Sequence, residues 1–70
     1  MTLGDFLLRK AKIGDVVLIR EYGWQIGCTR VDNDDLFIKS LHPDLLGRDV
    51  KRYEYAKRDW LVKDPLVVDI

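Results

Sequence analysis

Four consecutive apolar residues, at positions 16–19, constrain the fold of this chain more than any other part of its sequence. Apolar and mostly β-branched side chains at successive positions predict a strand that is covered on both faces. The preceding residues 2–10 begin with a capping-box pattern and have apolar side chains at helical spacing, which predicts a short helix. Those apolar side chains are Leu3, Phe6 and Leu7. We therefore expect 16–19 to be a central strand with this helix over one face.

Residues 15–31 have the pattern of a β-hairpin. The segment 22–24 contains the glycine and the bulky residues of a turn between two strand-like runs, and residues 25–31 form the returning strand. Alternation in the returning strand predicts two inward and two outward side chains. These are Ile26 and Cys28 inward, with Gln25 and Thr29 outward.

The middle of the chain contains two turn signals. Short acidic and amide side chains at 32–35 favour a turn, because they bond their own backbone. Residues 36–38 fit either a short strand or the start of a helix, and we favour the strand. Residues 43–46 lie between a proline suited to a helix start and a glycine suited to a helix end, so they predict one helical turn.

The last third of the chain predicts further strands. Residues 50–56 alternate as an antiparallel strand does, residues 57–59 form a connection, and residues 60–62 and 66–68 are both strand-like, with Pro65 causing a kink or edge. One face of the 50–56 strand carries Lys51, Tyr53 and Tyr55, and the other carries Arg52 and Glu54. The chain therefore predicts an α+β fold with an antiparallel sheet of four to five strands. We expect this sheet to curl toward a barrel of SH3 or OB-like size, with an N-terminal helix and the helical turn at 43–46.

Length and composition limit the class of protein. A chain of 70 residues buries one core, so we expect a single domain over 1–70. Cys28 is the only cysteine, which excludes an intrachain disulfide and favours the cytoplasm. The N-terminal residues lack the pattern of a signal peptide, and no window approaches the roughly 18 apolar residues of a membrane span. We therefore expect no contact with a membrane.

The charge balance bears on partners. Twelve Lys plus Arg balance twelve Asp plus Glu, so no global field draws the protein to nucleic acid or anionic lipid. Near-zero net charge favours self-association, and a homodimer is one assembly state that has to be tested.

Four blocks of the sequence occur in an order that resembles a known group of proteins. They are a helix like 2–7, a hairpin like 16–28, a segment like 43–50 and a closing strand like 66–70. With them the whole chain resembles a set of short bacterial and phage-associated proteins of gut Firmicutes and their mobile elements, a set with no assigned activity. The resemblance implies a small α+β sheet or barrel and carries over no site.

No arrangement of side chains predicts catalysis or a bound cofactor. Cys28 and His42 are the only pair that could imitate a nucleophile and its base, but a thiol in an apolar strand is inert, and His42 is better explained as flanking a helix start. The acidic residues of 32–35 invite a calcium site, yet the EF-hand template would put Phe37 where it needs glycine. We therefore expect no enzyme, no metal and no cofactor.

Aromatic and basic residues supply two candidate surfaces. A protein interface is predicted at three large rings, which are Tyr22, Trp24 and Trp60. A surface for single-stranded nucleic acid is the alternative, because bases stack on rings while cations follow the backbone. Its candidate residues are Lys51, Arg52, Tyr53, Tyr55, Lys57 and Arg58, with Trp60 as a further ring.

These surfaces give the hypotheses of function. We expect an accessory module that binds an unknown protein or itself, with nucleic-acid binding as the alternative. Interference with a host or defence protein is a third hypothesis, suggested by the phage-like resemblance.

Overall fold

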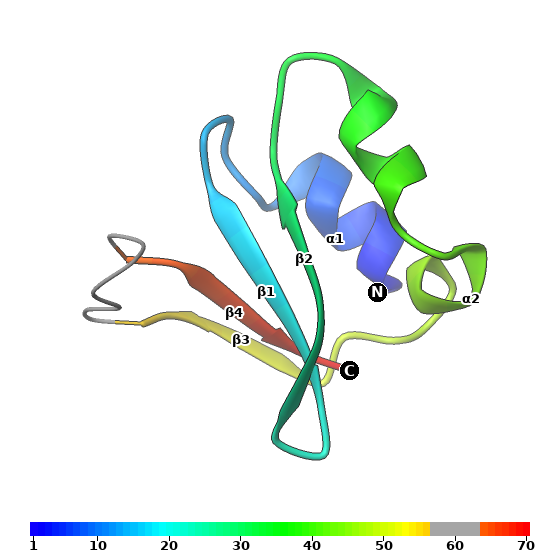
Figure 1. The fold of residues 1–70 in the computed structure, drawn as a ribbon, viewed down its shortest axis with the longest axis vertical. Coiled ribbons are helices and arrows are strands. Elements are labelled where there is room, and N and C mark those ends of the chain that lie inside the picture. Colours follow the sequence, from blue (N-terminus) through cyan, green and yellow to red (C-terminus); the bar gives the residue numbers. More distant parts are fainter. Residues whose placement is uncertain (57–63) are drawn as a thin grey trace.

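A computed structural model describes residues 1–56 and 64–70, apart from the side chains of residues 35 and 36. Figure 1 shows one sheet with helix α1 (Leu3–Arg9), the 3-10 helix η1 (Asp35–Ser40) and helix α2 (Pro43–Leu46) on one side of it. The expected α+β class and the N-terminal helix are confirmed.

Helix α1 begins at the predicted cap. The hydroxyl oxygen of Thr2 accepts a hydrogen bond from the N–H of Asp5 at 3.3 Å, which satisfies one of the free amides of the first turn. Leu3, Phe6 and Leu7 lie on the buried side of the helix, each 1% exposed or less. Their spacing therefore directs α1 onto the sheet as predicted.

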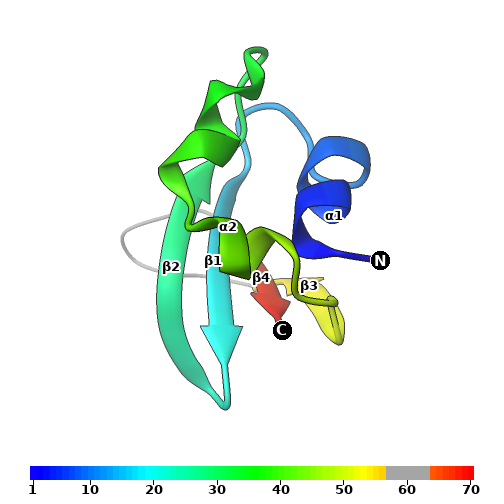
Figure 2. The ribbon, with the colours of Figure 1, turned by 90° about the vertical axis from the view of Figure 1, so that its right-hand side faces the viewer.

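The sheet has four strands in the order β2–β1–β4–β3 (Figure 2). Their bounds are β1 (Val16–Glu21), β2 (Trp24–Arg30), β3 (Arg52–Tyr55) and β4 (Leu66–Asp69). The pairs β1–β2 and β3–β4 are antiparallel, but β1 and β4 are parallel. The expected all-antiparallel sheet is therefore wrong, because the chain crosses back through η1, α2 and β3 before β4 joins β1 in the same direction. The sheet is also open rather than closed into a barrel.

The core lies between this sheet and the helical layer. Val17 and Ile19 of β1 and Leu66 and Val68 of β4 face α1, each 1% exposed or less. The other buried apolar residues in contact with them are Leu3, Phe6, Leu7, Val31, Leu41 and Ile70. As expected, 16–19 forms a central strand, but Val16 and Leu18 on its second face are only partly buried, so the expected cover on both faces is incomplete.

The facing of β2 differs from the prediction. Thr29 pairs with Val17 and is only 7% exposed, while Cys28 pairs with Leu18 and is exposed. Ile26, expected inward, is 42% exposed because the register with β1 shifts between Ile19 and Arg20. The turn and this irregularity set which residues face the core, and hydrophobicity alone did not reveal either.

The prediction of a strand at 36–38 is wrong, because this segment lies within the 3-10 helix η1. The hydroxyl of Ser40 donates to the carbonyl oxygen of Phe37 at 2.6 Å, and the hydroxyl of Thr29 donates to the same oxygen at 3.2 Å. These side-chain bonds satisfy the backbone locally and fasten η1 to β2.

In the second half of the chain, the predicted helical turn and the predicted antiparallel strand are both present. Helix α2 occupies the predicted 43–46 turn, with the proline in its first turn and Gly47 as its C-cap, and β3 is the predicted antiparallel strand. Pro65 directly precedes β4 and does not interrupt it. The expected connection at 57–59 and the strand-like run at 60–62 lie outside the described residues.

Candidate functional site

The turn between β1 and β2 holds a tyrosine in an unusual backbone conformation. Glu21 pairs with Trp24, so Tyr22 and Gly23 are the two central residues of a tight hairpin turn. Their φ angles are 53° and 83°, and positive φ at both positions is the signature of a type I′ turn. Asn and Gly adopt this conformation readily, whereas a tyrosine there costs on the order of 1 kcal/mol.

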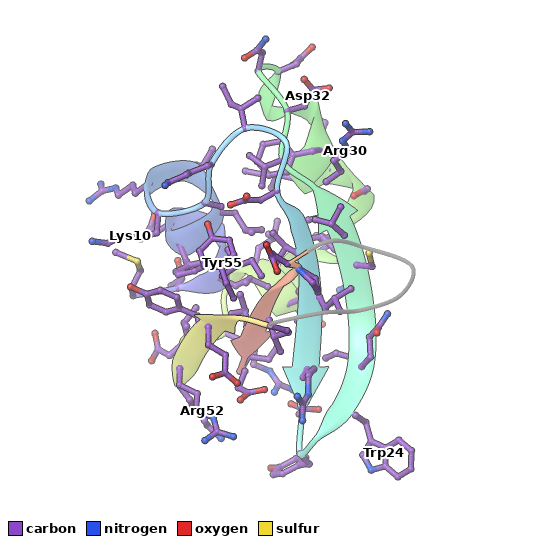
Figure 3. All side chains as sticks on the ribbon, turned by 90° about the vertical axis from the view of Figure 1, so that its left-hand side faces the viewer. Lys10, Trp24, Arg30, Asp32, Arg52 and Tyr55 are labelled. Carbon is purple, nitrogen blue, oxygen red and sulfur yellow. The ribbon has the colours of Figure 1, made fainter. Side chains whose placement is uncertain are left out.

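The aromatic rings of this turn project into solvent. We call Tyr22, Gly23 and Trp24 the hairpin tip. The exposed fractions of Tyr22 and Trp24 are 87% and 77%, and Figure 3 shows Trp24 at the far end of the hairpin. The ammonium of Lys51 lies 5.7 Å from the centroid of the Tyr22 ring, within the range of a cation–π contact. Trp60, the third ring of the predicted interface, lies outside the described residues.

Substitution of Tyr22 by asparagine tests the cost of the turn. We expect Tyr22→Asn to raise the free energy of unfolding by about 0.5–1 kcal/mol, because asparagine followed by glycine suits a type I′ turn. Tyr22→Phe keeps the same backbone demand and should leave stability nearly unchanged. Urea unfolding of the three proteins gives the comparison, and a less stable asparagine variant would contradict the description of the turn.

A charged cluster lies on the sheet face opposite α1. The carboxylate of Asp69 accepts a hydrogen bond from Nε of Arg52 at 2.7 Å and lies 3.7 Å from Nε of Arg20. The Asp69 side chain is 22% exposed, whereas that of Arg52 is 81% exposed. The hydrogen bond and the negative charge of Asp69 raise the pKa of Arg52. The guanidinium therefore keeps its proton, and the carboxylate of Asp69 balances part of its positive charge.

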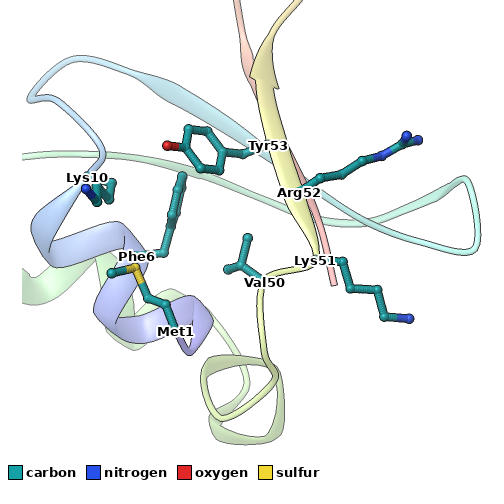
Figure 4. Close-up of a pocket in the computed structure, with 7 residues that line it drawn as sticks. All are labelled: Met1, Phe6, Lys10, Val50, Lys51, Arg52 and Tyr53. Carbon is teal, nitrogen blue, oxygen red and sulfur yellow. The ribbon is translucent and has the colours of Figure 1, made fainter.

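The candidate nucleic-acid residues of β3 do not share one surface. Tyr53 and Tyr55 are about half exposed and lie on the α1 side, where the Tyr53 ring contacts Phe6 at a centroid distance of 4.7 Å. Arg52 lies on the other face, bound to Asp69. Figure 4 shows the Arg52 and Lys51 side chains leading away from the Tyr53 ring. The expected common face of Lys51, Tyr53 and Tyr55 is therefore wrong for Lys51, because the carbonyl of Asp69, the partner of Arg52, also accepts the N–H of Lys51. Lys57 and Arg58 lie outside the described residues.

An apolar pocket opens where α1 meets the beginning of β3 (Figure 4). Its volume is about 320 Å³. The apolar lining comes from Met1, Phe6, Val50 and Tyr53, and the other lining residues are the basic Lys10, Lys51 and Arg52. The Tyr53 ring therefore forms both the wall of this pocket and a cover over Phe6.

Tyr55 is tied to the start of β1. Its hydroxyl donates a hydrogen bond to a carboxylate oxygen of Asp15 at 2.7 Å. This hydrogen bond, followed by partial burial and the negative charge of Asp15, raises the pKa of Tyr55 above its ordinary value of 10.0. The neutral phenol thus makes a contact that the phenolate cannot make.

This contact predicts a loss of stability in alkali. Because the folded state holds the Tyr55 proton more tightly than the unfolded state, its contribution is complete below about pH 10 and is lost as the pH rises through the raised pKa. We expect Tyr55→Phe to flatten the decline in urea stability above about pH 10. Tyr53→Phe, whose hydroxyl makes no hydrogen bond in the described structure, is the control and should retain the decline.

Two of the residues considered for catalysis and metal binding, His42 and Asp32, form hydrogen bonds with nearby backbone N–H groups. Nδ1 of His42 accepts a hydrogen bond from the N–H of Asp44 at 3.2 Å and caps α2, as its position before a helix start predicted. Within residues 1–56 and 64–70, no hydrogen bond joins His42 to Cys28. Asp32 accepts the N–H of Asn33 at 2.7 Å. Over the same residues, no three His, Cys, Asp or Glu side chains gather as a metal site would require.

In comparisons with known proteins, no family model, no curated protein and no solved structure matches this chain. In the described part of the chain, no helix has the length and apolar character needed to cross a membrane.

Sequence reasoning did not identify Asp69 as part of the charged cluster. Alternation along 66–70 places it on the face opposite Leu66 and Val68, and the same alternation places Arg52 on one face of β3. The sequence could not show that Asp69 contacts both Arg20 and Arg52, because these contacts depend on the strand order.

Proposed function

We propose that this protein is a small accessory module that binds another protein through the hairpin tip. The observation that carries the proposal is Tyr22, which occupies a left-handed backbone position and keeps its ring 87% exposed. A strained residue that contributes little burial suggests a role in recognition rather than in stability. Trp24 beside it is also exposed, and Trp and Tyr are the residue types that most often dominate the energy of protein interfaces.

The proposal includes a location and a mode of action. Cys28 is a free, exposed thiol, which suits the reducing cytoplasm. The module acts by binding rather than by catalysis, and a host or defence protein of the cell is one class of target. Two adjacent rings on a rigid turn lose little side-chain freedom on binding, which favours affinity.

Affinity capture followed by direct binding tests the proposal. The tagged chain is used to capture proteins from the lysate of its host, and each captured protein is then purified and titrated against the variants. We expect Trp24→Ala to weaken binding by about tenfold or more, with the fold intact by circular dichroism. Ile13→Ala is the matched control, because Ile13 is another apolar residue with 67% exposure outside the hairpin tip. Equal losses from both substitutions, or no loss from Trp24→Ala, would refute the hairpin tip as the contact surface.

Binding of single-stranded nucleic acid stays a prediction, with less support than protein binding. Arg52 and Tyr53 lie on opposite faces of β3, whereas a stacking platform needs rings and cations on one surface. Fluorescence anisotropy with a short oligonucleotide at low and high salt distinguishes the two functions. Tight binding that weakens steeply with salt would favour the alternative.

A further inference from the structure

Strand β3 forms one edge of the sheet, with β4 as its only neighbour among the described residues. The N–H of Ala56 donates to the carbonyl of Pro65 at 2.9 Å, which makes these two residues a hydrogen-bonded pair. Pair types alternate along an antiparallel ladder, so the backbone groups of Tyr53 and Tyr55 point away from β4. We call this outward side of Arg52–Tyr55 the β3 edge.

The β3 edge is bounded, and its protection consists of its short length and of the charges of Arg52 and Glu54. Just before β3, the N–H of Val50 donates to the carbonyl of Met1 at 2.9 Å. The outward backbone N–H at this position is therefore already bonded to the N-terminal segment. The opposite edge strand, β2, pairs with an irregular register near Ile19, and irregularities of this kind discourage edge-to-edge pairing. Within Arg52–Tyr55 the pairing with β4 shows no register shift, and these four residues include no proline and no lysine. Directly before them, however, the N–H of Lys51 donates at 2.8 Å to the carbonyl of Asp69, the residue that pairs with Arg52, so a local irregularity and a lysine border this edge.

The charges of the β3 edge are complementary to themselves. Arg52 and Glu54 flank Tyr53 on the face opposite α1. The Arg52 guanidinium contacts Asp69 and is otherwise largely exposed, so further donors stay available. Glu54 makes no ion pair with any described residue. A strand that runs antiparallel to β3 and carries the same sequence could pair each of these charges with its opposite.

We propose that two copies of this chain form a dimer by antiparallel pairing of their β3 edges, with Tyr53 of one copy opposite Tyr53 of the other. The outward backbone groups of the two Tyr53 residues form a hydrogen-bonded pair. Arg52 of each copy then lies opposite Glu54 of the other in the non-hydrogen-bonded pairs, where side chains approach most closely. This inference concerns a surface separate from the hairpin tip and does not depend on it.

Charge selects this register over its neighbours. Outward-facing residues must meet outward-facing residues, so the pairing can shift only by two positions at a time. A shift that places Tyr53 opposite Tyr55 brings Glu54 opposite Glu54, and the reverse shift brings Arg52 opposite Arg52. Like charges directly opposite each other destabilise a strand pair. The register with Tyr53 at the symmetry axis is the one that forms two opposite-charge pairs.

The α1 side of the same edge offers apolar contact. The Tyr53 ring is 52% exposed and forms a wall of the apolar pocket beside Phe6 and Met1 (Figure 4). In the proposed register the two Tyr53 residues are direct neighbours, so each ring gains an aromatic partner near this pocket. The dimer thus combines charge pairs on one face with ring contacts on the other.

Sedimentation velocity of the whole chain over a concentration series tests the dimer. We expect the wild type to dimerise, and Glu54→Arg to raise the dissociation constant at least about tenfold, since both symmetric pairs become repulsive. Arg30→Glu, a charge reversal on the opposite edge strand β2, is the matched control and should leave the dimer intact. A wild type that stays monomeric throughout, or a dimer disrupted by Arg30→Glu and not by Glu54→Arg, would overturn the proposal.

A mixing experiment isolates the charge pairs from any effect on folding. Arg52→Glu and Glu54→Arg each place like charges opposite each other in their own homodimers, but an equimolar mixture of the two restores opposite charges at both positions. We expect the mixture to form a heterodimer that neither variant forms with itself, and its absence between folded variants would refute the register. Amide exchange of Tyr53, slowed in the wild type as concentration rises, would locate the interface at the β3 edge. Trp24→Ala should not change either result, which separates this test from that of the proposed function.

Discussion

Replacement of Phe6 by alanine is expected to leave little folded protein at room temperature. The ring of Phe6 is 1% exposed, lies between α1 and the sheet, and contacts Tyr53 at a centroid distance of 4.7 Å. Truncation of a buried phenylalanine costs about 3–5 kcal/mol, through lost burial and the cavity that remains. A domain of this size has a total stability of only about 5 kcal/mol, so the loss is close to the whole.

Circular dichroism and urea unfolding measure this effect, and Leu8→Ala supplies the control. Leu8 lies on the same helix but is 53% exposed, so its truncation should cost less than about 1 kcal/mol. If the two substitutions changed the free energy of unfolding equally, the packing of α1 against the sheet would be wrong.

Introduction of a carboxylate at Val68 is expected to abolish folding at neutral pH. Val68 lies in β4, between β1 and β3, and its side chain is fully buried beside Ile19 and Tyr53. Val68→Asp would bury a charge without a partner, which costs several kcal/mol in this setting. We expect the aspartate variant to lack a cooperative thermal transition.

A threonine at the same position separates the effect of charge from that of shape. Val68→Thr keeps the branched shape and adds one hydroxyl, so it should fold with a loss of about 1–3 kcal/mol. Differential scanning calorimetry of both variants gives the comparison. A cooperative transition in Val68→Asp near that of the wild type would show that β4 does not occupy the centre of the core.

Local signals in the sequence were sufficient for several elements. The cap at Thr2 and the spacing of Leu3, Phe6 and Leu7 predicted α1, because capping and amphipathicity act within one or two turns. The hairpin, the single turn of α2 and the alternation of β3 were predicted for the same reason. Each of these depends on neighbours within a few residues.

The errors concern features that depend on distant parts of the chain. The parallel pairing of β1 with β4 follows from the route of the chain between them, and no local pattern encodes that route. The facing of Thr29 depended on the turn and on the register shift in β2. Segment 36–38 was too short for periodicity, and hydrogen bonds from Thr29 and Ser40 decided its conformation.

The candidate site was predicted in part. Tyr22 and Trp24 were singled out as large rings at a turn, but the positive φ of Tyr22 became evident only in the structure. The self-complementary charges of Arg52 and Glu54 are visible in the sequence. Their significance depends on β3 being an edge strand, which requires the strand order.

The pairing of β1 with β4 also has a consequence during synthesis of the protein. Val17 leaves the ribosome well before Leu66, its neighbour across the parallel pair. Until that partner emerges, one edge of β1 lacks its neighbouring strand in the nascent chain, and an unpaired edge favours aggregation and contact with chaperones. We therefore expect a chain that terminates between β1 and β4 to lack this pairing and to expose the β4-facing edge of β1.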